Sequence, residues 1–219
     1  MAQNSAAVGR CRVAGVWAQD AKRMLVGYEA NNILRNSGRL GDYGRTLVSK
    51  LASRHIADYR ALLFASHIRK AYRTFHTGFA NVSTYLPSGM AKLLPEAWLR
   101  YQIEPWLSAE RVKVFHALNE ELPYNIGRNV KTVVTCYDPG NHWCNSLFDR
   151  MLWKRRMSYS FAVADAVVVP GEEVRRRLEA EGVMPEKIVV IGTGSPYEVT
   201  DQMVEQYFQL YSKLAGPKA

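Results

Sequence analysis

Four side chains that could take part in catalysis lie close to the ends of predicted β-strands. His116 ends one apolar segment, Asn119 comes three residues later, and Tyr137 and Asp138 follow the next apolar segment. Because ligands bind at the carboxyl ends of the strands in open α/β sheets, these residues are candidates for catalysis or substrate binding. Two other interpretations stay open. His116 could hydrogen-bond the loop that follows it, and Tyr-Asp-Pro-Gly is also the composition of an ordinary turn.

Three glycines, Gly38, Gly41 and Gly44, lie in a predicted loop between the first strand and a helix that is expected to begin at Asp42. Glycines in such a place let backbone N–H groups approach a phosphate, and a helix N-terminus favours its negative charge. The spacing is not that of the dinucleotide-binding fingerprint. A turn that requires positive φ is the alternative, and the spacing alone favours it.

Two clusters of basic residues on predicted helices could contact anionic lipid headgroups. They are Lys154, Arg155 and Arg156, and Arg175, Arg176 and Arg177. A solvated helix face is the commoner explanation for such clusters. The net charge of +9 favours acidic partners, but it does not distinguish nucleic acid, anionic lipid and phosphorylated substrates.

The three cysteines, Cys11, Cys136 and Cys144, form no CxxC pair. An odd number of cysteines without metal-ligand spacing suits a reducing compartment and free thiols. We therefore expect no metal site and a cytoplasmic location, with contact at the inner face of the membrane left open. No apolar run approaches the roughly 20 residues that span a bilayer.

Short apolar runs alternate with helix patterns along most of the chain. The runs lie near residues 24–28, 112–116, 130–136, 166–169 and 187–191. This alternation predicts a Rossmann-like α/β domain, with one parallel sheet and helices on both faces. We expect this domain to cover residues 24–196, after a weakly ordered extension over residues 1–23.

The last segment, residues 197–219, contains a strongly amphipathic helix over 201–214. Its apolar residues, spaced to form one stripe, are Met203, Tyr207, Leu210, Tyr211 and Leu214. Little sequence follows this helix. Its apolar face is therefore expected to return to the preceding domain or to meet another chain.

Several stretches, in this order, resemble the N-terminal domain of family 4 glycosyltransferases. They are GYEANNILRNSGRLGDYGRTLVSKLA (27–52), NVSTYLPSG (81–89), VFHALNEELPYNI (114–126), KTVVTCYDP (131–139) and ADAVVVPGEEVRRRLEAEGVMPEKIVVIGTGSP (164–196). These are retaining, sugar-nucleotide-dependent enzymes of the two-domain GT-B fold. The resemblance implies that the predicted domain is one half of a GT-B enzyme.

The resemblance also implies roles for the candidate residues. The segment from Gly38 to Gly41 would face the donor diphosphate, and His116 and Asn119 would line the cleft. The family has a histidine, facing the acceptor and the reaction centre, where this chain has Tyr137. His116 and Asp138 therefore remain the candidates for catalysis, and Tyr137 is expected to face the substrate.

In the family a second, donor-binding domain follows the segment that ends near Pro196, and the helix 201–214 resembles the final helix that returns to the first domain. The expected function is glycosyl transfer from a nucleotide sugar to a glycan or lipid-linked acceptor in polysaccharide biosynthesis, incomplete in this chain as it stands. No nucleic acid is expected as a partner. The alternative is a catalytically inactive binding or scaffold protein that pairs with another chain or with an anionic membrane surface.

Overall fold

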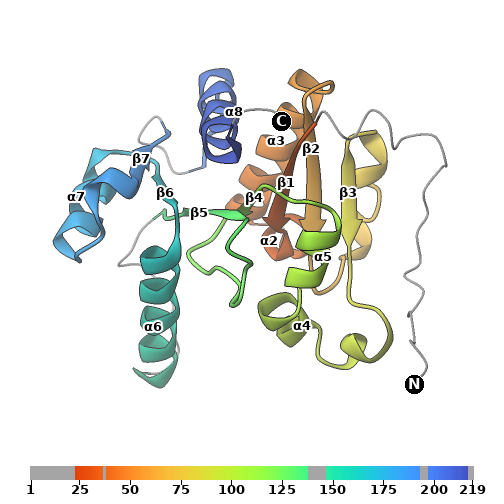
Figure 1. Ribbon diagram of the computed structural model, residues 1–219, viewed down its shortest axis with the longest axis horizontal. Helices are drawn as coiled ribbons and strands as arrows, with labels where there is room; N and C mark the ends of the chain where they lie inside the picture. The colour runs from red at the N-terminus through yellow and green to blue at the C-terminus, as the bar shows by residue number, and fades with distance from the viewer. Residues whose placement is uncertain (1–22, 37, 138–146, 193–196, 217–219) are drawn as a thin grey trace.

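The computed structural model describes residues 23–36, 38–137, 147–192 and 197–216, and the predicted extension over residues 1–23 therefore lies almost wholly outside the described part. Seven strands form one sheet in the order β3-β2-β1-β4-β5-β6-β7, and each neighbouring pair is parallel (Figure 1). The strands are β1 (Met24–Glu29), β2 (Tyr59–Phe64), β3 (Val82–Tyr85), β4 (Val114–Ala117), β5 (Lys131–Thr135), β6 (Ala166–Val169) and β7 (Ile188–Val190). The predicted parallel sheet is thus confirmed.

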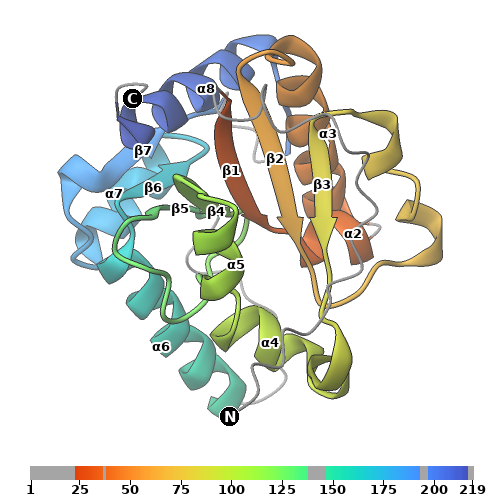
Figure 2. The same cartoon turned by 45° about the vertical axis from the view of Figure 1, so that its right-hand side comes forward.

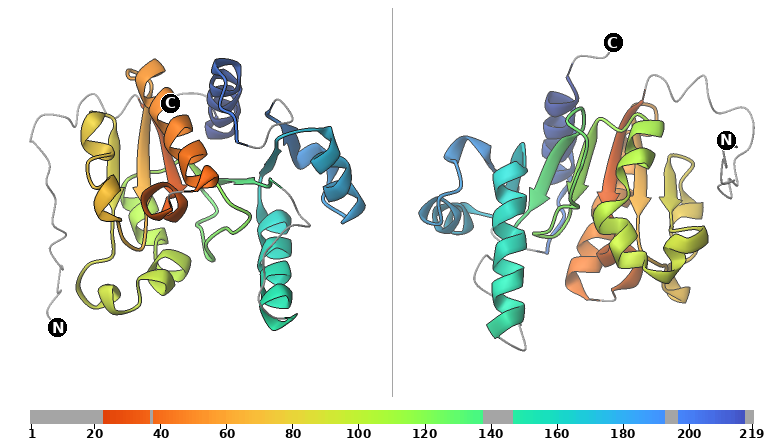
Figure 3. Two further views of the ribbon diagram at one scale, coloured as in Figure 1. Left: turned by 180° about the vertical axis from the view of Figure 1, so that it is seen from behind. Right: turned by 60° about the horizontal axis from the view of Figure 1, so that its bottom comes forward.

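Helices cover both faces of this sheet (Figures 2 and 3). The α-helices are α2 (Asn31–Arg35), α3 (Arg39–Arg54), α4 (Pro95–Tyr101), α5 (Glu104–Ala109), α6 (Leu147–Val163), α7 (Glu172–Ala180) and α8 (Asp201–Ala215). Short 3-10 turns are η1 (Lys70–Tyr72), η2 (His76–Gly78), η3 (Gly89–Leu93) and η4 (Pro185–Lys187). One apolar cluster joins the sheet to α2, α3 and α8, and a second joins it to α4, α5, α6 and α7. This is the Rossmann-like α/β arrangement that the sequence predicts.

The strand order reverses between β1 and β4. From β1 the chain builds outward to β2 and β3, and it then returns to place β4 on the other side of β1. The connections that leave the carboxyl ends of β1 and β4 diverge to opposite sides of the sheet. Such a switch point leaves a crevice beyond the strand ends, where open α/β sheets bind ligands.

The prediction of a loop between β1 and Asp42 is wrong. Residues Asn31–Arg35 form α2, and α3 begins at Arg39, so Gly41 and Gly44 lie within a helix.

Close packing, and not positive φ, explains the glycine at position 41. A Cβ atom there would lie 2.3 Å from the carbonyl oxygen of Asn36 and 2.7 Å from that of Asn32. A side chain would therefore separate α2 from α3. Gly38, at the N-cap of α3, has a φ of −90°, which any residue adopts.

Helix α8 packs on the body of the domain, as its stripe predicts. Met203, Tyr207 and Tyr211 are buried against the same cluster as α3 and β1, and Leu210 and Leu214 are partly buried there. The Thr200 hydroxyl accepts a hydrogen bond from the Met203 N–H (3.3 Å) at the start of the helix.

Ion pairs join the first turn of α8 to the last turns of α3. Asp201 pairs with Lys50 (3.0 Å) and with Arg54. These pairs are exposed and contribute little free energy. The buried tyrosines therefore hold α8 in place.

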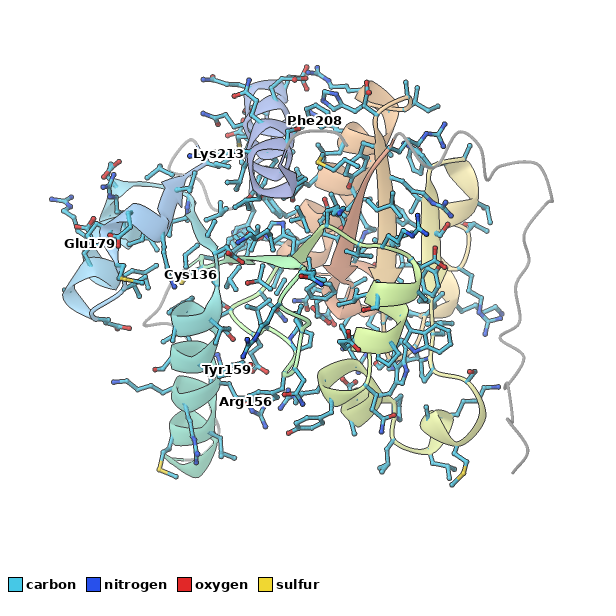
Figure 4. All side chains as sticks on the ribbon, in the orientation of Figure 1. Cys136, Arg156, Tyr159, Glu179, Phe208 and Lys213 are labelled. Atoms are coloured by element: carbon cyan, nitrogen blue, oxygen red, sulfur yellow. The ribbon has the colours of Figure 1, made fainter. Side chains whose placement is uncertain are left out.

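We expect the Tyr211→Ala variant to lose about 3–5 kcal/mol of unfolding free energy, because it removes a fully buried aromatic ring and leaves a cavity. Urea denaturation followed by circular dichroism measures this loss. Lys213→Ala, on the exposed side of α8 (Figure 4), is the matched control and should leave the midpoint unchanged. Deleting residues 200–219 should lower the melting temperature further or cause aggregation, and an unchanged melting curve would contradict the packing role of α8.

Candidate functional site

Glu29, the last residue of β1, carries a buried carboxyl group at the strand switch point. It is 5% exposed, and its Oε1 atom accepts a hydrogen bond from the Asn31 backbone N–H (3.0 Å). Its Oε2 atom is also buried and has no hydrogen-bond partner within the described residues. Burial raises the pKa of Glu29 to about 7, and the nearby charges of Glu96 and Glu121 raise it further against the lowering effect of the Asn31 N–H. The group is therefore close to half-protonated at neutral pH.

A hollow opens in front of Glu29 at the carboxyl ends of β1 and β4. Its lining consists of Glu29, Asn31, Glu96, Leu99, Arg100, Asn119, Glu121, Leu122 and Pro123. Amides, carboxyls and one guanidinium thus surround a small apolar surface. These groups include both donors and acceptors of hydrogen bonds, which suits a ligand rich in hydroxyl groups.

Side-chain contacts fix the rim of this hollow. Glu96 on α4 accepts hydrogen bonds from Asn31 (3.1 Å) and from the Ser66 hydroxyl (2.9 Å), and it pairs with Arg35. Arg100, one turn further along α4, pairs with Glu121 (2.9 Å). Residues from α2, from α4 and from the loops after β2 and β4 are thereby held at one edge of the sheet.

A second hollow of about 610 Å³ lies beside the first, beyond the carboxyl ends of β2 and β3. Its lining consists of Ser66, His67, Ile68, Arg73, Leu86, Pro87, Lys92 and Pro95. Its charged groups are cationic, and its remaining wall is largely apolar. The two hollows therefore differ in chemistry although they share one edge.

His116 lies in the interior, beneath α8, and it lines neither hollow. The imidazole is fully buried, with Nδ1 2.6 Å from the Tyr211 hydroxyl and Nε2 2.8 Å from the Thr135 hydroxyl. The Tyr59 hydroxyl donates to that of Tyr28 (2.8 Å), which donates to that of Tyr211 (3.2 Å). These directions leave the Tyr211 proton for Nδ1 and place the ring proton on Nε2. Burial lowers the pKa of His116 to about 3, so the ring is neutral.

The other predicted residues lie nearer the carboxyl edge. Asn119 lines the first hollow together with Glu29. Tyr137 is buried, with its ring at 5.5 Å from that of Tyr43 on α3 and stacked at 5.8 Å on that of Tyr197. Asp138 lies outside the described residues.

The start of α3 is close to the end of β5. Gly38 is exposed at the N-cap, and the Arg39 guanidinium lies 5.9 Å from the centre of the Tyr197 ring, which in turn stacks on Tyr137. Gly41 is buried within α3. The structure thus brings Tyr137 to the N-terminal turns of α3 and Asn119 to Glu29, and it places His116 apart from both hollows.

Sequence reasoning missed Glu29 and Glu96. Glu29 carried a usable signal, because an acidic residue that ends an apolar strand lies at the ligand-binding edge of a parallel sheet. Glu96 gave no such signal. It lies on a short helix that only the tertiary fold brings to β1.

The two basic clusters are partly compensated by acidic residues. On α7, Arg175 pairs with Glu179 (2.9 Å), and Arg177 pairs with Glu173 (2.5 Å). On α6, Arg156 reaches Glu121 at the rim of the first hollow (3.7 Å), and Figure 4 shows its side chain leaving the helix on that side. These contacts agree with solvated helix faces.

Within the described residues, no cluster of three or more histidine, cysteine or acidic side chains has the arrangement of a metal site. In the same part of the chain, no helix is both long and apolar enough to cross a membrane. Cys136 is buried and forms no disulfide bond within the described residues, whereas Cys11 and Cys144 lie outside them.

Comparison with known proteins identifies the family. The sequence model of Glycosyltransferase Family 4 matches residues 43–198, and the chain belongs to this family. Among solved structures, S. aureus MnaA with UDP is 12% identical, with a TM-score of 0.53 over 82% of this chain and 47% of that one. Anabaena HepE in complex with UDP is 14% identical, with a TM-score of 0.50 over 86% and 49% of the two chains. No curated protein sequence matches.

These similarities define the fold as one half of a GT-B fold. The chain spans about half the length of the solved structures that it matches.

The pKa of Glu29 leads to a prediction for the stability of Glu29→Gln. Because the folded-state pKa of about 7 exceeds the ordinary value of 4.5, ionisation opposes folding, and this cost grows as the pH rises from about 4.5 to 7. The variant should therefore gain unfolding free energy relative to the wild type at pH 8, by at most about 3 kcal/mol, and little at pH 4. Glu186→Gln, at an exposed position, is the control. Parallel stability profiles for Glu29→Gln and the wild type would show that Glu29 ionises as it does in water.

The effect of pH on stability through His116 is opposite to that through Glu29. Its folded-state pKa is depressed, so its contribution to stability is present above the ordinary pKa of 6.5 and is lost as the pH falls towards about 3. His116→Gln lacks the titrating ring and should lose less unfolding free energy than the wild type between pH 7 and pH 4. His67→Gln, an exposed histidine, is the control. Because Glu29 acts oppositely in part of this range, variant and wild type are compared at each pH, and equal losses would place His116 in contact with water.

Proposed function

We propose that this chain is a glycosyltransferase-type protein whose carboxyl edge binds the acceptor of a glycosyl transfer from a nucleotide sugar. The observation that carries the proposal is the hollow at the strand switch point, with the half-satisfied carboxyl group of Glu29 at its wall. Membership of Glycosyltransferase Family 4 supports the reaction class. The acceptor that we propose is a glycan or a lipid-linked saccharide.

Glu29 is the group best placed to act on an acceptor hydroxyl. With a pKa of about 7 it can accept a proton in one form and donate a hydrogen bond in the other. Asn31 and Asn119 beside it would orient neighbouring hydroxyls. The resemblance suggests His116 and Asp138 as further catalytic candidates, but the His116 ring does not reach the hollow.

The N-terminal turns of α3 would face the donor diphosphate. The backbone N–H groups after Gly38, the helix dipole and the Arg39 side chain all favour negative charge there. Gly41 would contribute to this site by allowing α3 to begin close to α2. The structures with UDP of S. aureus MnaA and Anabaena HepE support a nucleotide-sugar ligand. In this proposal the donor is a substrate, and neither a metal nor another cofactor is required.

A catalytically inactive binding or scaffold protein is the second candidate. The specific observation in its favour is that Tyr137 stands where the resemblance to the family implies a histidine at the reaction centre. Such a protein would bind a saccharide and pair with another chain. We propose a cytoplasmic location for either candidate. The basic clusters of α6 and α7, which the sequence alone suggested as a contact with the inner face of the membrane, are tested below against another surface.

We expect the purified chain to bind oligosaccharides and to show no appreciable turnover of UDP-sugars. Saturation-transfer NMR against a panel of oligosaccharides measures binding, and release of UDP measures turnover. Glu29→Gln should weaken saccharide binding about tenfold, which corresponds to one charged hydrogen bond, whereas Glu186→Gln should not change it.

No saccharide binding by the wild type would contradict the proposed acceptor site. UDP release that Glu29→Gln abolishes would support the site and contradict the inactive binding protein. UDP release abolished by His116→Ala and not by Glu29→Gln would move catalysis to the histidine.

A further inference from the structure

The segment between β3 and α4 exposes four large apolar side chains within nine residues. The exposed fractions are 86% for Met90, 78% for Leu93, 70% for Leu94 and 43% for Leu86. Burial of one such side chain is favourable by about 1.5–3 kcal/mol in general, so four together in water are unfavourable. Clustered exposed apolar residues of this kind mark surfaces that bind another molecule.

The fold holds these side chains outward. The 3-10 turn η3 begins at Gly89, whose φ is +57°, and is followed closely by Pro95 at the start of α4. Ala91 packs against the apolar cluster below, and Pro87 is buried. The turn is thus anchored on one side, and its larger residues project from the other. In Figure 2 it protrudes from the domain next to α4.

The charge of the chain that leads into this turn is of one sign. From Tyr59 to Pro95 the sequence contains no aspartate or glutamate, although it contains five lysines and arginines. Four of these, Arg69, Lys70, Arg73 and Lys92, are exposed. Arg175 and Arg177 of α7, in contrast, pair with acidic residues of their own helix.

The second hollow joins the apolar and the cationic residues. Arg73 and Lys92 line it together with Leu86 and Pro87, and its volume is about 610 Å³. An apolar tip with cationic flanks complements the interface of an anionic bilayer, where acyl chains lie beneath phosphate groups. The nearest acidic residue along the chain, Glu96, pairs with Arg35 and lies on the side of the first hollow.

We propose that η3 and its flanks form a membrane-docking surface, in which Met90, Leu93 and Leu94 enter the bilayer interface while Lys70, Arg73 and Lys92 contact anionic phosphate groups. This surface is separate from the basic clusters on α6 and α7, and the docking does not depend on the proposed transfer reaction. It would orient the carboxyl edge of the sheet towards the bilayer, because Pro95 of the second hollow adjoins Glu96 of the first.

Co-sedimentation with vesicles tests the proposal. The full chain is mixed with vesicles of phosphatidylcholine alone and with vesicles that also contain phosphatidylglycerol. The wild type should bind the anionic vesicles, and its binding should weaken as salt is added. The triple variant Met90→Ser, Leu93→Ser, Leu94→Ser removes the apolar tip. The triple variant Lys70→Gln, Arg73→Gln, Lys92→Gln removes the cations, and it should weaken binding roughly a hundredfold.

The matched control is Lys154→Gln, Arg155→Gln, Arg176→Gln, which removes the same charge from α6 and α7 and should bind like the wild type. All these positions are exposed, and melting curves equal to that of the wild type verify folding. Loss of binding in the control alone would overturn the proposal in favour of the basic helices. Absence of vesicle binding would overturn it too, as would a dimer in analytical ultracentrifugation that the apolar variant abolishes while vesicle binding persists.

Discussion

A neutral imidazole lies at the centre of the sheet, and α8 closes over it. The Tyr59 hydroxyl donates a hydrogen bond to that of Tyr28, which donates to that of Tyr211, which in turn donates to Nδ1 of His116. The Nε2–H group of His116 then donates to the Thr135 hydroxyl. Every side chain in this series of hydrogen bonds is buried, and leaving a buried polar group without a partner costs about 1–3 kcal/mol of unfolding free energy. The position of α8 therefore depends on the neutral state of the ring. A second proton on it would direct an N–H at the Tyr211 hydroxyl.

Two polar groups at the ends of neighbouring strands thus have opposite roles. His116 has both nitrogens bonded and is closed to solvent, which is typical of a group that supports the structure. Glu29 has one oxygen bonded and the other unpartnered within the described residues, and it opens onto a hollow. An unsatisfied carboxyl group of this kind weakens the fold at neutral pH. It is retained at a place where a ligand can satisfy it, which is why we assign the site to Glu29.

The other polar and charged groups of the candidate site lie at the carboxyl edge of the sheet because the strand order reverses there. The first hollow offers amides and carboxyls, the second offers cations and apolar wall, and the turn η3 extends the second towards the surface. A saccharide acceptor carried on a lipid would place its hydroxyl groups in the first hollow, its phosphate groups beside the cations of the second, and its lipid beside η3. Such a substrate is our proposal; family membership supports the class of reaction, and the nucleotide is proposed to lie against the N-terminal turns of α3.

The sequence was sufficient to predict the parallel sheet and the packing of α8, because both depend on local apolar periodicity. It could not locate the start of α3, because Gly41 is required by the approach of two carbonyl oxygens from α2, which no local pattern reports. It also could not decide between a buried and an accessible His116. That outcome depends on Tyr211, which lies 95 residues away along the chain.

Amide chemical-shift mapping tests the central assignment most directly. An isotope-labelled chain is titrated with an oligosaccharide that binds, while the His116 ring signals are followed. We predict shifts concentrated at Glu29, Asn31 and Asn119, with the His116 ring unchanged in its neutral Nε2–H form. Shifts centred on His116 and α8, with the edge residues unaffected, would contradict the account.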